Sequence, residues 1–205
     1  MYLLNMNRLK RLLILLYVLL SSVVVFGQSK LRDSVYVKTD IFEVMYSETL
    51  QQPLWVKYTV KCPNGSESRK GLDFYICDSI ITSDDLDYVK NIYDKGHMAP
   101  AASFNCDRIT LVKTFTYLNS ALQHQDLNRI TWRNLESYER LLALSHSVVK
   151  IEIKCIYSDS SIKLPTGATV PDAFIKTIYY GNKVESYYFK NEKPKSNDFK
   201  QYRIR

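Results

Sequence analysis

The sequence predicts an α+β fold in which an antiparallel β framework surrounds a central helical segment. Three observations predict it. Apolar and polar residues alternate through 54–61 and 149–155, and this period of two is typical of half-buried strands. A Gly181-Asn182 pair separates two further strand-like segments, which predicts a hairpin. Between these strand-rich parts, apolar residues recur at helical spacing from 128 to 145.

Residues 1–27 have the organisation of a signal peptide. The first eleven residues hold three basic side chains and no acidic one: Arg8, Lys10 and Arg11. An almost unbroken apolar run follows over 12–26, and Gly27 supplies the small residue before a cut at Gln28. An uncleaved membrane anchor is the alternative, because the run is only a little shorter than a spanning helix. With cleavage we expect a secreted or periplasmic protein that has no stable membrane association.

Residues 28–205 are expected to form a single domain. Their number suits one sizeable core, and no internal repeat, low-complexity tract or Pro/Gly-rich linker divides them. The net charge of the chain is +7, and removal of the three basic residues before Gln28 leaves +4. This mild basic excess suits a polyanionic partner, but many solvated surfaces carry as much charge.

Further strands are predicted next to the strand at 54–61 and on both sides of the Gly181-Asn182 turn. Segment 42–46 precedes the strand at 54–61, and segment 74–77 follows it after the turn-like Pro63-Asn64-Gly65-Ser66. Segments 175–180 and 184–189 flank the Gly181-Asn182 turn. The helix at 128–145 contains no Pro or Gly that would interrupt it.

The four cysteines are even in number, and an oxidising compartment would permit disulfides among them. The four are Cys62, Cys77, Cys106 and Cys155. Three pairings are open, of which Cys62 with Cys77 would link two neighbouring strands; buried free thiols are the alternative. No Cys-x-x-Cys spacing suggests zinc.

Two ordered motifs carry the candidate chemistry. The first is Asp94-Lys95-Gly96-His97-Met98-Ala99-Pro100, and the second is Asn119 followed by Asn128-Arg129-Ile130-Thr131-Trp132-Arg133-Asn134-Leu135-Glu136. A downstream segment, 170–176, completes the pattern. Together they resemble the DNA/RNA non-specific endonucleases, which include mitochondrial endonuclease G and secreted bacterial nucleases. The resemblance spans roughly residues 42–190 and implies a ββα-metal (His-Me finger) core inside the β framework.

His97 is the candidate general base. A neutral imidazole near its ordinary pKa can take a proton from water at neutral pH, so we expect cleavage to fade as the pH falls and His97 becomes protonated. Alone, such a histidine would more often be structural, and His124 and His146 are interpreted in that way. Trp132 is interpreted as core packing.

The resemblance implies roles for the other motif residues. It makes Asn128 the one direct protein ligand of Mg²⁺, which Mn²⁺ can replace, although an Asn at a helix start can also be simply an N-cap. Glu136 would hold metal-bound water. Asn119 would orient the His97 loop or a metal-bound water.

Basic residues near these motifs are candidates for phosphate contacts. Lys95 stands where the family often has Arg, and either can stabilise phosphate charge. Arg69 is the nearest candidate for a further family arginine, and Arg129 is a candidate on the helix, where it can equally be part of the solvated face.

The implied function is a secreted, Mg²⁺-dependent endonuclease that cuts DNA and RNA with little sequence preference. The alternative is a catalytically impaired, exported nucleic-acid-binding or surface-interaction module with the same fold. Retention of His97, Asn128 and Glu136 favours the enzyme, because binding alone needs no general base. Family members are often dimers, so a homodimer is a possible assembly, but no residue marks its interface.

Overall fold

The computed structural model describes residues 31–205, so the predicted signal peptide and its cut at Gln28 lie outside the described residues. In this described part of the chain, eight strands form two sheets, and short helices occupy the connections between them. None of the helices within 31–205 combines the length and apolar character that a membrane crossing requires.

The larger sheet has six strands in the order β1-β2-β3-β6-β7-β8, and every neighbouring pair is antiparallel. Its strands are β1 (Val35–Lys38), β2 (Phe42–Ser47), β3 (Gln52–Thr59), β6 (Val149–Ile156), β7 (Ala173–Tyr180) and β8 (Lys183–Lys190). Strands β3 and β6 are far apart in sequence but pair side by side, with Trp55 opposite Lys154. The predicted antiparallel framework is therefore confirmed, including the hairpin at Gly181.

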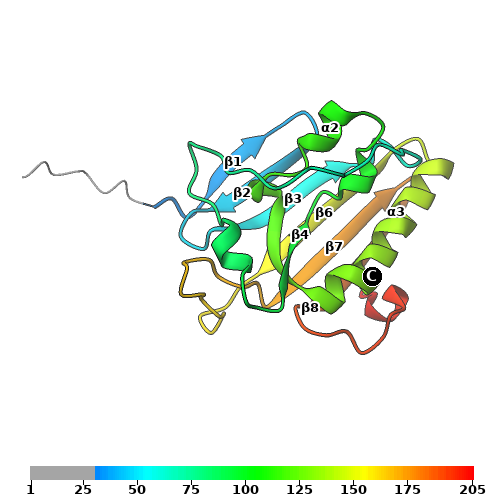
Figure 1. Ribbon diagram of the computed structural model, residues 1–205. Helices are drawn as coiled ribbons and strands as arrows, with labels where there is room; N and C mark the ends of the chain where they lie inside the picture. Colours follow the sequence, from blue (N-terminus) through cyan, green and yellow to red (C-terminus); the bar gives the residue numbers. More distant parts are fainter. Residues whose placement is uncertain (1–30) are drawn as a thin grey trace, which may run out of the picture. The chain divides into compact units, whose positions relative to one another are not determined.

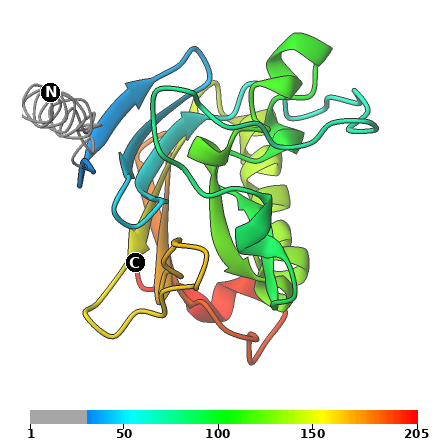
Figure 2. The same cartoon turned by 60° about the vertical axis from the view of Figure 1, so that its left-hand side comes forward.

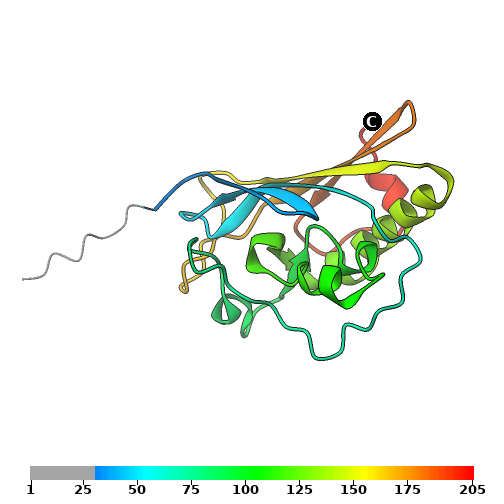
Figure 3. The same cartoon turned by 90° about the horizontal axis from the view of Figure 1, so that it is seen from above.

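A second layer covers one face of this sheet (Figures 1, 2 and 3). It contains a two-stranded antiparallel sheet of β4 (Tyr93–His97) and β5 (Ser120–His124), followed by a helical segment. The small helices of this layer are η1 (Asp85–Tyr88), η2 (Ala101–Ser103), α2 (Arg108–Val112) and η3 (Tyr117–Asn119). A last short helix, η5 (Phe199–Tyr202), precedes the C-terminus.

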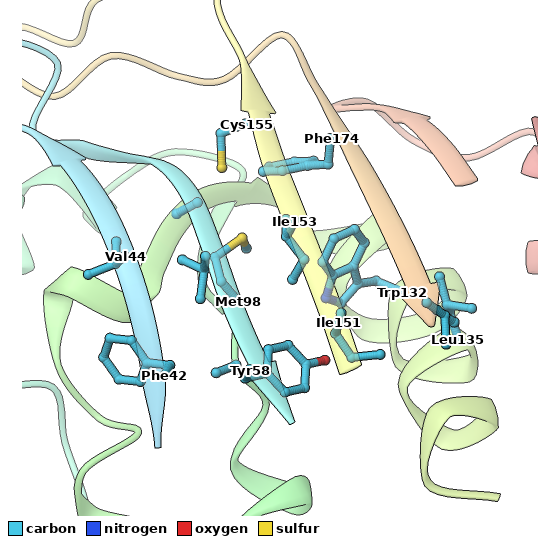
Figure 4. Close-up of a cluster of buried hydrophobic side chains, with 14 of the residues drawn as sticks. Phe42, Val44, Tyr58, Met98, Trp132, Leu135, Ile151, Ile153, Cys155 and Phe174 are labelled. Atoms are coloured by element: carbon cyan, nitrogen blue, oxygen red, sulfur yellow. The ribbon is translucent and has the colours of Figure 1, made fainter. Parts of the chain in front are cut away.

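The main core lies between the two layers (Figure 4). Val44, Val56 and Ile153 point inward from the large sheet and are fully buried. Trp132 of the second layer meets Phe174 edge-on, with ring centroids 5.5 Å apart. Full burial of such side chains contributes roughly 1.5–3 kcal/mol each, which explains why the apolar faces dictate this arrangement. Trp132 is a core residue, as predicted.

A buried ion pair also joins the layers. Lys176 of β7 and Glu139 are both inaccessible to solvent, and Nζ lies 2.6 Å from the carboxylate Oε1. The hydroxyl of Tyr58 donates to the same carboxylate, and the Lys176 ammonium lies 4.1 Å from the centroid of the Trp132 ring. Because an unpaired charge here would be costly, these contacts fix the helix that carries Glu139 against the sheet.

The expectation that segment 74–77 forms a strand is wrong. Within residues 31–205 the segment makes a single parallel bridge, between Tyr75 and Thr116. Strand β3 is already paired on both sides, by β2 and β6, so no free edge is left for this segment. The disulfide accordingly joins Cys62 to Cys106, while Cys77 and Cys155 are free thiols.

The predicted helix at 128–145 is present but begins differently. It opens with a π-helical segment, η4 (Leu127–Trp132), and continues as α3 (Arg133–Ser145). The N-cap position belongs to Asp126, so Asn128 lies inside the first turn and is not the cap. π-Helical turns occur frequently at functional sites, and this one carries the predicted metal ligand.

Candidate active site

Strand β4 carries the first motif and ends at His97. It pairs with β5 so that His97 lies opposite Ser120 and Gly96 opposite Ala121. A Cβ at position 96 would lie 2.6 Å from the Cβ of Gln123, so glycine is required for the close approach of that side chain. Sequence patterns did not predict these two short strands.

The His97 imidazole is packed between aromatic rings and is 9% exposed. Its centroid lies 4.7 Å from that of Phe74 and 4.8 Å from that of Phe115, and its buried Nε2 has no hydrogen-bond partner among the described residues. Burial, and secondarily the positive charge of Arg69, lower the pKa of His97 to about 3. The ring is therefore neutral at physiological pH. At this pKa, we expect His97 of the free protein to stay neutral in mildly acidic solution, in contrast to the expectation from an ordinary histidine pKa.

Asn119 fixes the backbone that follows His97. Its side chain is fully buried, Oδ1 accepts a hydrogen bond from the Ala99 N–H at 2.7 Å, and Nδ2 donates to the carbonyls of Ala99 and Thr114 at 2.8 and 2.9 Å. Its own carbonyl accepts from the Met98 N–H at 2.8 Å. Of the two roles considered for Asn119, these contacts place it on the His97 loop.

Asn128 is oriented by Asp94, the first residue of the His97 motif. The Asn128 Nδ2 donates to Asp94 Oδ2 at 2.9 Å, which directs the amide oxygen away from that carboxylate. Arg129 binds the same carboxylate in a fork, at 2.9 Å from Nε and 2.7 Å from Nη2. Asp94 belongs to the first motif, but no role was predicted for it. The structure makes it the link between the two motifs.

Glu136 lies on α3 and is partly buried. Burial raises the pKa of Glu136 to about 7, against the opposing effect of positive charges on Lys176, Arg140 and Arg69. The guanidinium carbon of the exposed Arg69 lies 5.5 Å from the centroid of the Phe115 ring, which packs against His97. Arg69 is therefore near His97, and its role there stays a prediction.

Arg140 contributes positive charge near Glu136, and the sequence analysis did not select it as a candidate. Its Nη1 is buried and has no hydrogen-bond partner among the described residues, while Nη2 donates to Ser137. The available signal was its position four residues after Glu136, since residues four apart lie side by side on a helix.

Lys95 is held by two carboxylates. Its ammonium lies 3.1 Å from Asp73 Oδ1 and also bonds Asp85, and it lies 5.5 Å from the Phe74 ring and 5.4 Å from the Tyr117 ring. The positive charge of Lys95, which was predicted to contact phosphate, is therefore already balanced by two carboxylates. Arg69 forms no ion pair among the described residues.

The donors that face this region suit a hard, hydrated cation. Within residues 31–205 no three His, Cys, Asp or Glu side chains cluster as a ligand set. The oriented amide oxygen of Asn128 and the Glu136 carboxylate are oxygen donors of the kind that Mg²⁺ accepts while it keeps several waters.

The model of the DNA/RNA non-specific endonuclease family matches residues 27–205. The chain belongs to the DNA/RNA non-specific endonuclease family. Among solved structures, the EndoG chain in a complex with EndoGI superimposes with a TM-score of 0.74 at 24% identity, covering 83% of this chain and 80% of that one. This likeness supports the predicted ββα-metal fold, in which β4, β5 and the η4–α3 segment form the core.

Curated relatives within the family match part of the chain. Mitochondrial endonuclease G of Bos taurus is 29% identical over 115 residues, which are 54% of this chain and 38% of that protein. The Homo sapiens protein is 30% identical over 115 residues, 54% of this chain and 39% of its own length. Mitochondrial nuclease EXOG of Danio rerio is 30% identical over 109 residues, 51% of this chain and 32% of that protein. The chain therefore spans well under two thirds of the length of these relatives.

Proposed function

We propose that this protein is an exported, Mg²⁺-dependent endonuclease that hydrolyses phosphodiester bonds of DNA and RNA with little sequence preference. The observation that carries the proposal is the state of His97, which is neutral, buried and unpartnered at Nε2, on a backbone that Asn119 fixes. A buried polar atom left without a partner costs free energy, so it indicates a position kept for chemistry. Membership of the endonuclease family supports the same conclusion.

His97 acts as the general base, and its neutral imidazole accepts a proton from the attacking water. A pKa of about 3 makes the imidazole a weak base in the free protein. The negative charge of a bound phosphodiester opposes the nearby positive charge of Arg69 and raises that pKa when substrate is present. Arg69 and Arg140 supply positive charge close to Glu136, where a phosphate would bind.

The proposed metal is Mg²⁺, with Mn²⁺ as a substitute, held directly by Asn128 and through water by Glu136. When bound, the ion relieves charge on the phosphate and its waters can supply a proton to the leaving oxygen. Asp94 keeps the Asn128 amide in the orientation that presents oxygen. An oriented amide ligand is an arrangement that binding of nucleic acid alone does not require.

Export is part of the proposal. The Cys62–Cys106 disulfide supports it, because disulfides persist in oxidising compartments and are rare in reducing ones. The pairing also ties the end of β3 to the segment that follows the His97 motif.

The test incubates purified residues 28–205 with supercoiled plasmid and with RNA, in Mg²⁺ or in EDTA. The variants are His97→Ala and Asn128→Ala. His146→Ala is the matched control, because His146 is a hydrogen-bonded histidine at the end of α3. We expect Mg²⁺-dependent cutting by the wild type and the control, and a loss of roughly 10²- to 10⁴-fold without the His97 imidazole.

Other outcomes decide against the proposal. Cutting that persists in both site variants would indicate a contaminant or another site. Nucleic acid that is bound but never cut, by any of the proteins, would favour the catalytically impaired binding module.

A further inference from the structure

Within residues 31–205, the six-stranded sheet has one covered face and one face that no described element covers. The second layer and α3 lie on the same side (Figure 3), and side chains that point to the other side are accessible. Tyr36 is 50% exposed, Tyr179 39% and Tyr188 37%. Aromatic rings are large apolar groups, so their accumulation on an uncovered sheet indicates a surface that binds something.

The strand register aligns two of these rings, Tyr36 and Tyr188, in one row with Trp55. Tyr36 lies opposite Met45, Met45 opposite Trp55 and Trp55 opposite Lys154. The row continues on the far side of Lys154 to Ile175 and Tyr188. The Tyr36 and Trp55 ring centroids are 6.0 Å apart. The row thus crosses all six strands, a span of about 24 Å at the usual strand spacing.

A hollow of about 500 Å³ lies at one end of this face, beside Tyr179. Its lining includes four lysines: Lys38, Lys57, Lys61 and Lys150. Each carboxylate of the lining is already paired. Asp40 binds Lys113, Glu43 binds Lys38, and Glu152 binds Lys57 and Lys154.

Two of these lysines have uncompensated charge. Within residues 31–205, neither Lys61 nor Lys150 forms an ion pair, and both are exposed. Two free ammonium groups beside a tyrosine ring suit a ligand that carries both an anion and a flat apolar group. Exposed bases and phosphates of a single nucleic-acid strand have this combination, because bases stack on aromatic rings while lysines neutralise the backbone.

We propose that this open-face site, formed by Lys61, Lys150, Tyr179 and Trp55, binds a single-stranded segment of DNA or RNA away from the His97 site. This proposal rests on the proposed function, because the bound strand is a distal part of the nucleic acid that the proposed nuclease cuts. Phosphates lie at Lys61 and Lys150, one base stacks on Tyr179, and a further base stacks on Trp55, which lies on β3 four residues before Thr59, the partner of Lys150.

The chain itself connects the two sites. Lys61 follows the end of β3 and precedes Cys62, whose disulfide to Cys106 joins the sheet to the layer that carries His97. The segment from Lys61 leads directly into the loop that bears Arg69. A nucleic-acid strand held on the open face can therefore pass around this end of β3 towards the His97 site.

The test measures binding without cleavage. His97→Ala protein in EDTA is titrated into labelled oligothymidylate or oligouridylate of about 30 nucleotides, and into a duplex of equal length, with fluorescence anisotropy as the readout. The charge variant is Lys61→Glu with Lys150→Glu. Lys163→Glu with Lys200→Glu is the matched control, because these exposed lysines lie away from the hollow and the change of net charge is the same.

We expect the charge variant to bind both single strands at least about tenfold more weakly than the control pair does. The slope of log affinity against log salt should also fall by about 1.4, as for two lost single-strand phosphate contacts. Tyr179→Ala should weaken binding at least about fivefold, and Tyr179→Phe should retain it, because stacking needs the ring and not the hydroxyl. Comparison of the two oligomers then shows whether DNA or RNA is preferred.

Three results would overturn the open-face site. The charge variant and the control pair could weaken binding equally, or Tyr179→Ala could have no effect. The third contrary result is that Trp55→Ala and Tyr179→Ala dissociate a dimer, as measured by light scattering, and do not weaken single-strand binding. That result would show that the open face is an interface between two copies of the chain. Plasmid cutting by the wild-type chain tests the proposed function separately, because none of these binding measurements depends on catalysis.

Discussion

Replacement of Glu136 by Gln tests the electrostatics of the site most directly. Burial raises the pKa of this carboxyl from 4.5 to about 7 in the metal-free protein. A group whose pKa is raised on folding favours the folded state fully only below its unfolded pKa. This contribution is lost as the pH rises towards the folded pKa, because folding then opposes ionisation.

The size of the effect follows from the same shift. A rise from 4.5 to about 7 corresponds to about 3 kcal/mol at pH 8.5, at 1.36 kcal/mol per pH unit, and to less than about 1 kcal/mol at pH 5. Partial solvent access to the carboxylate reduces both values. Glu136→Gln removes the ionisable group, so we expect the variant to be more stable than the wild type by about 1–3 kcal/mol at pH 8.5 and nearly equal at pH 5.

The assay is urea denaturation in EDTA at both pH values. The depressed pKa of His97 also makes stability depend on pH below 6.5, but this contribution is common to both proteins and cancels in the difference. Glu152→Gln serves as a control on the open face, where no such gain is expected. A gain that is absent at pH 8.5, or is the same at both pH values, would refute the account of Glu136. The gain in stability should be accompanied by loss of Mg²⁺-dependent cutting.

Three further substitutions or treatments have defined outcomes. Asn119→Ala leaves one buried N–H and two carbonyls without their partner, and should cost about 3 kcal/mol or more in urea denaturation and abolish cutting; a cost below about 1 kcal/mol would contradict the clamp. Asp94→Ala should raise the Mg²⁺ concentration for half-maximal cutting about 10- to 100-fold, measured by metal titration, and an unchanged titration would exclude Asp94 as the group that orients Asn128. Reduction of the Cys62–Cys106 bond, with a sequence separation of 44, should lower the free energy of unfolding by about 4 kcal/mol; identical urea midpoints with and without reductant would show that the cross-link contributes nothing.

Much of the fold could be predicted from periodicity. The alternation at 54–61 and 149–155 marks strands β3 and β6, because these strands are covered on one face only. The turn at Gly181 joins β7 to β8. Strands β4 and β5 escaped prediction. They are short, and most of β5 is buried on both sides, so no alternation marks it. For segment 74–77 the prediction was wrong in the other direction. Its residue types favour a strand, but neither side of β3 is free to pair with it.

The order and spacing of the motifs predicted most of the candidate site residues. His97, Asn119, Asn128 and Glu136 were selected because their chemistry lies in residue types at fixed positions. Arg140 was not, because a buried guanidinium and a solvated one look alike in a helical sequence.

The sequence by itself determined the class of fold, the family and the residues that carry its motifs, since these depend on local pattern and residue chemistry. Only the tertiary structure decided that Cys62 pairs with Cys106, that Asp94 orients Asn128, and that burial between Phe74 and Phe115 holds His97 neutral. Each of these depends on which distant segments come together. Hydrogen bonding and desolvation act between neighbours in space, and periodicity along the chain does not encode those neighbours.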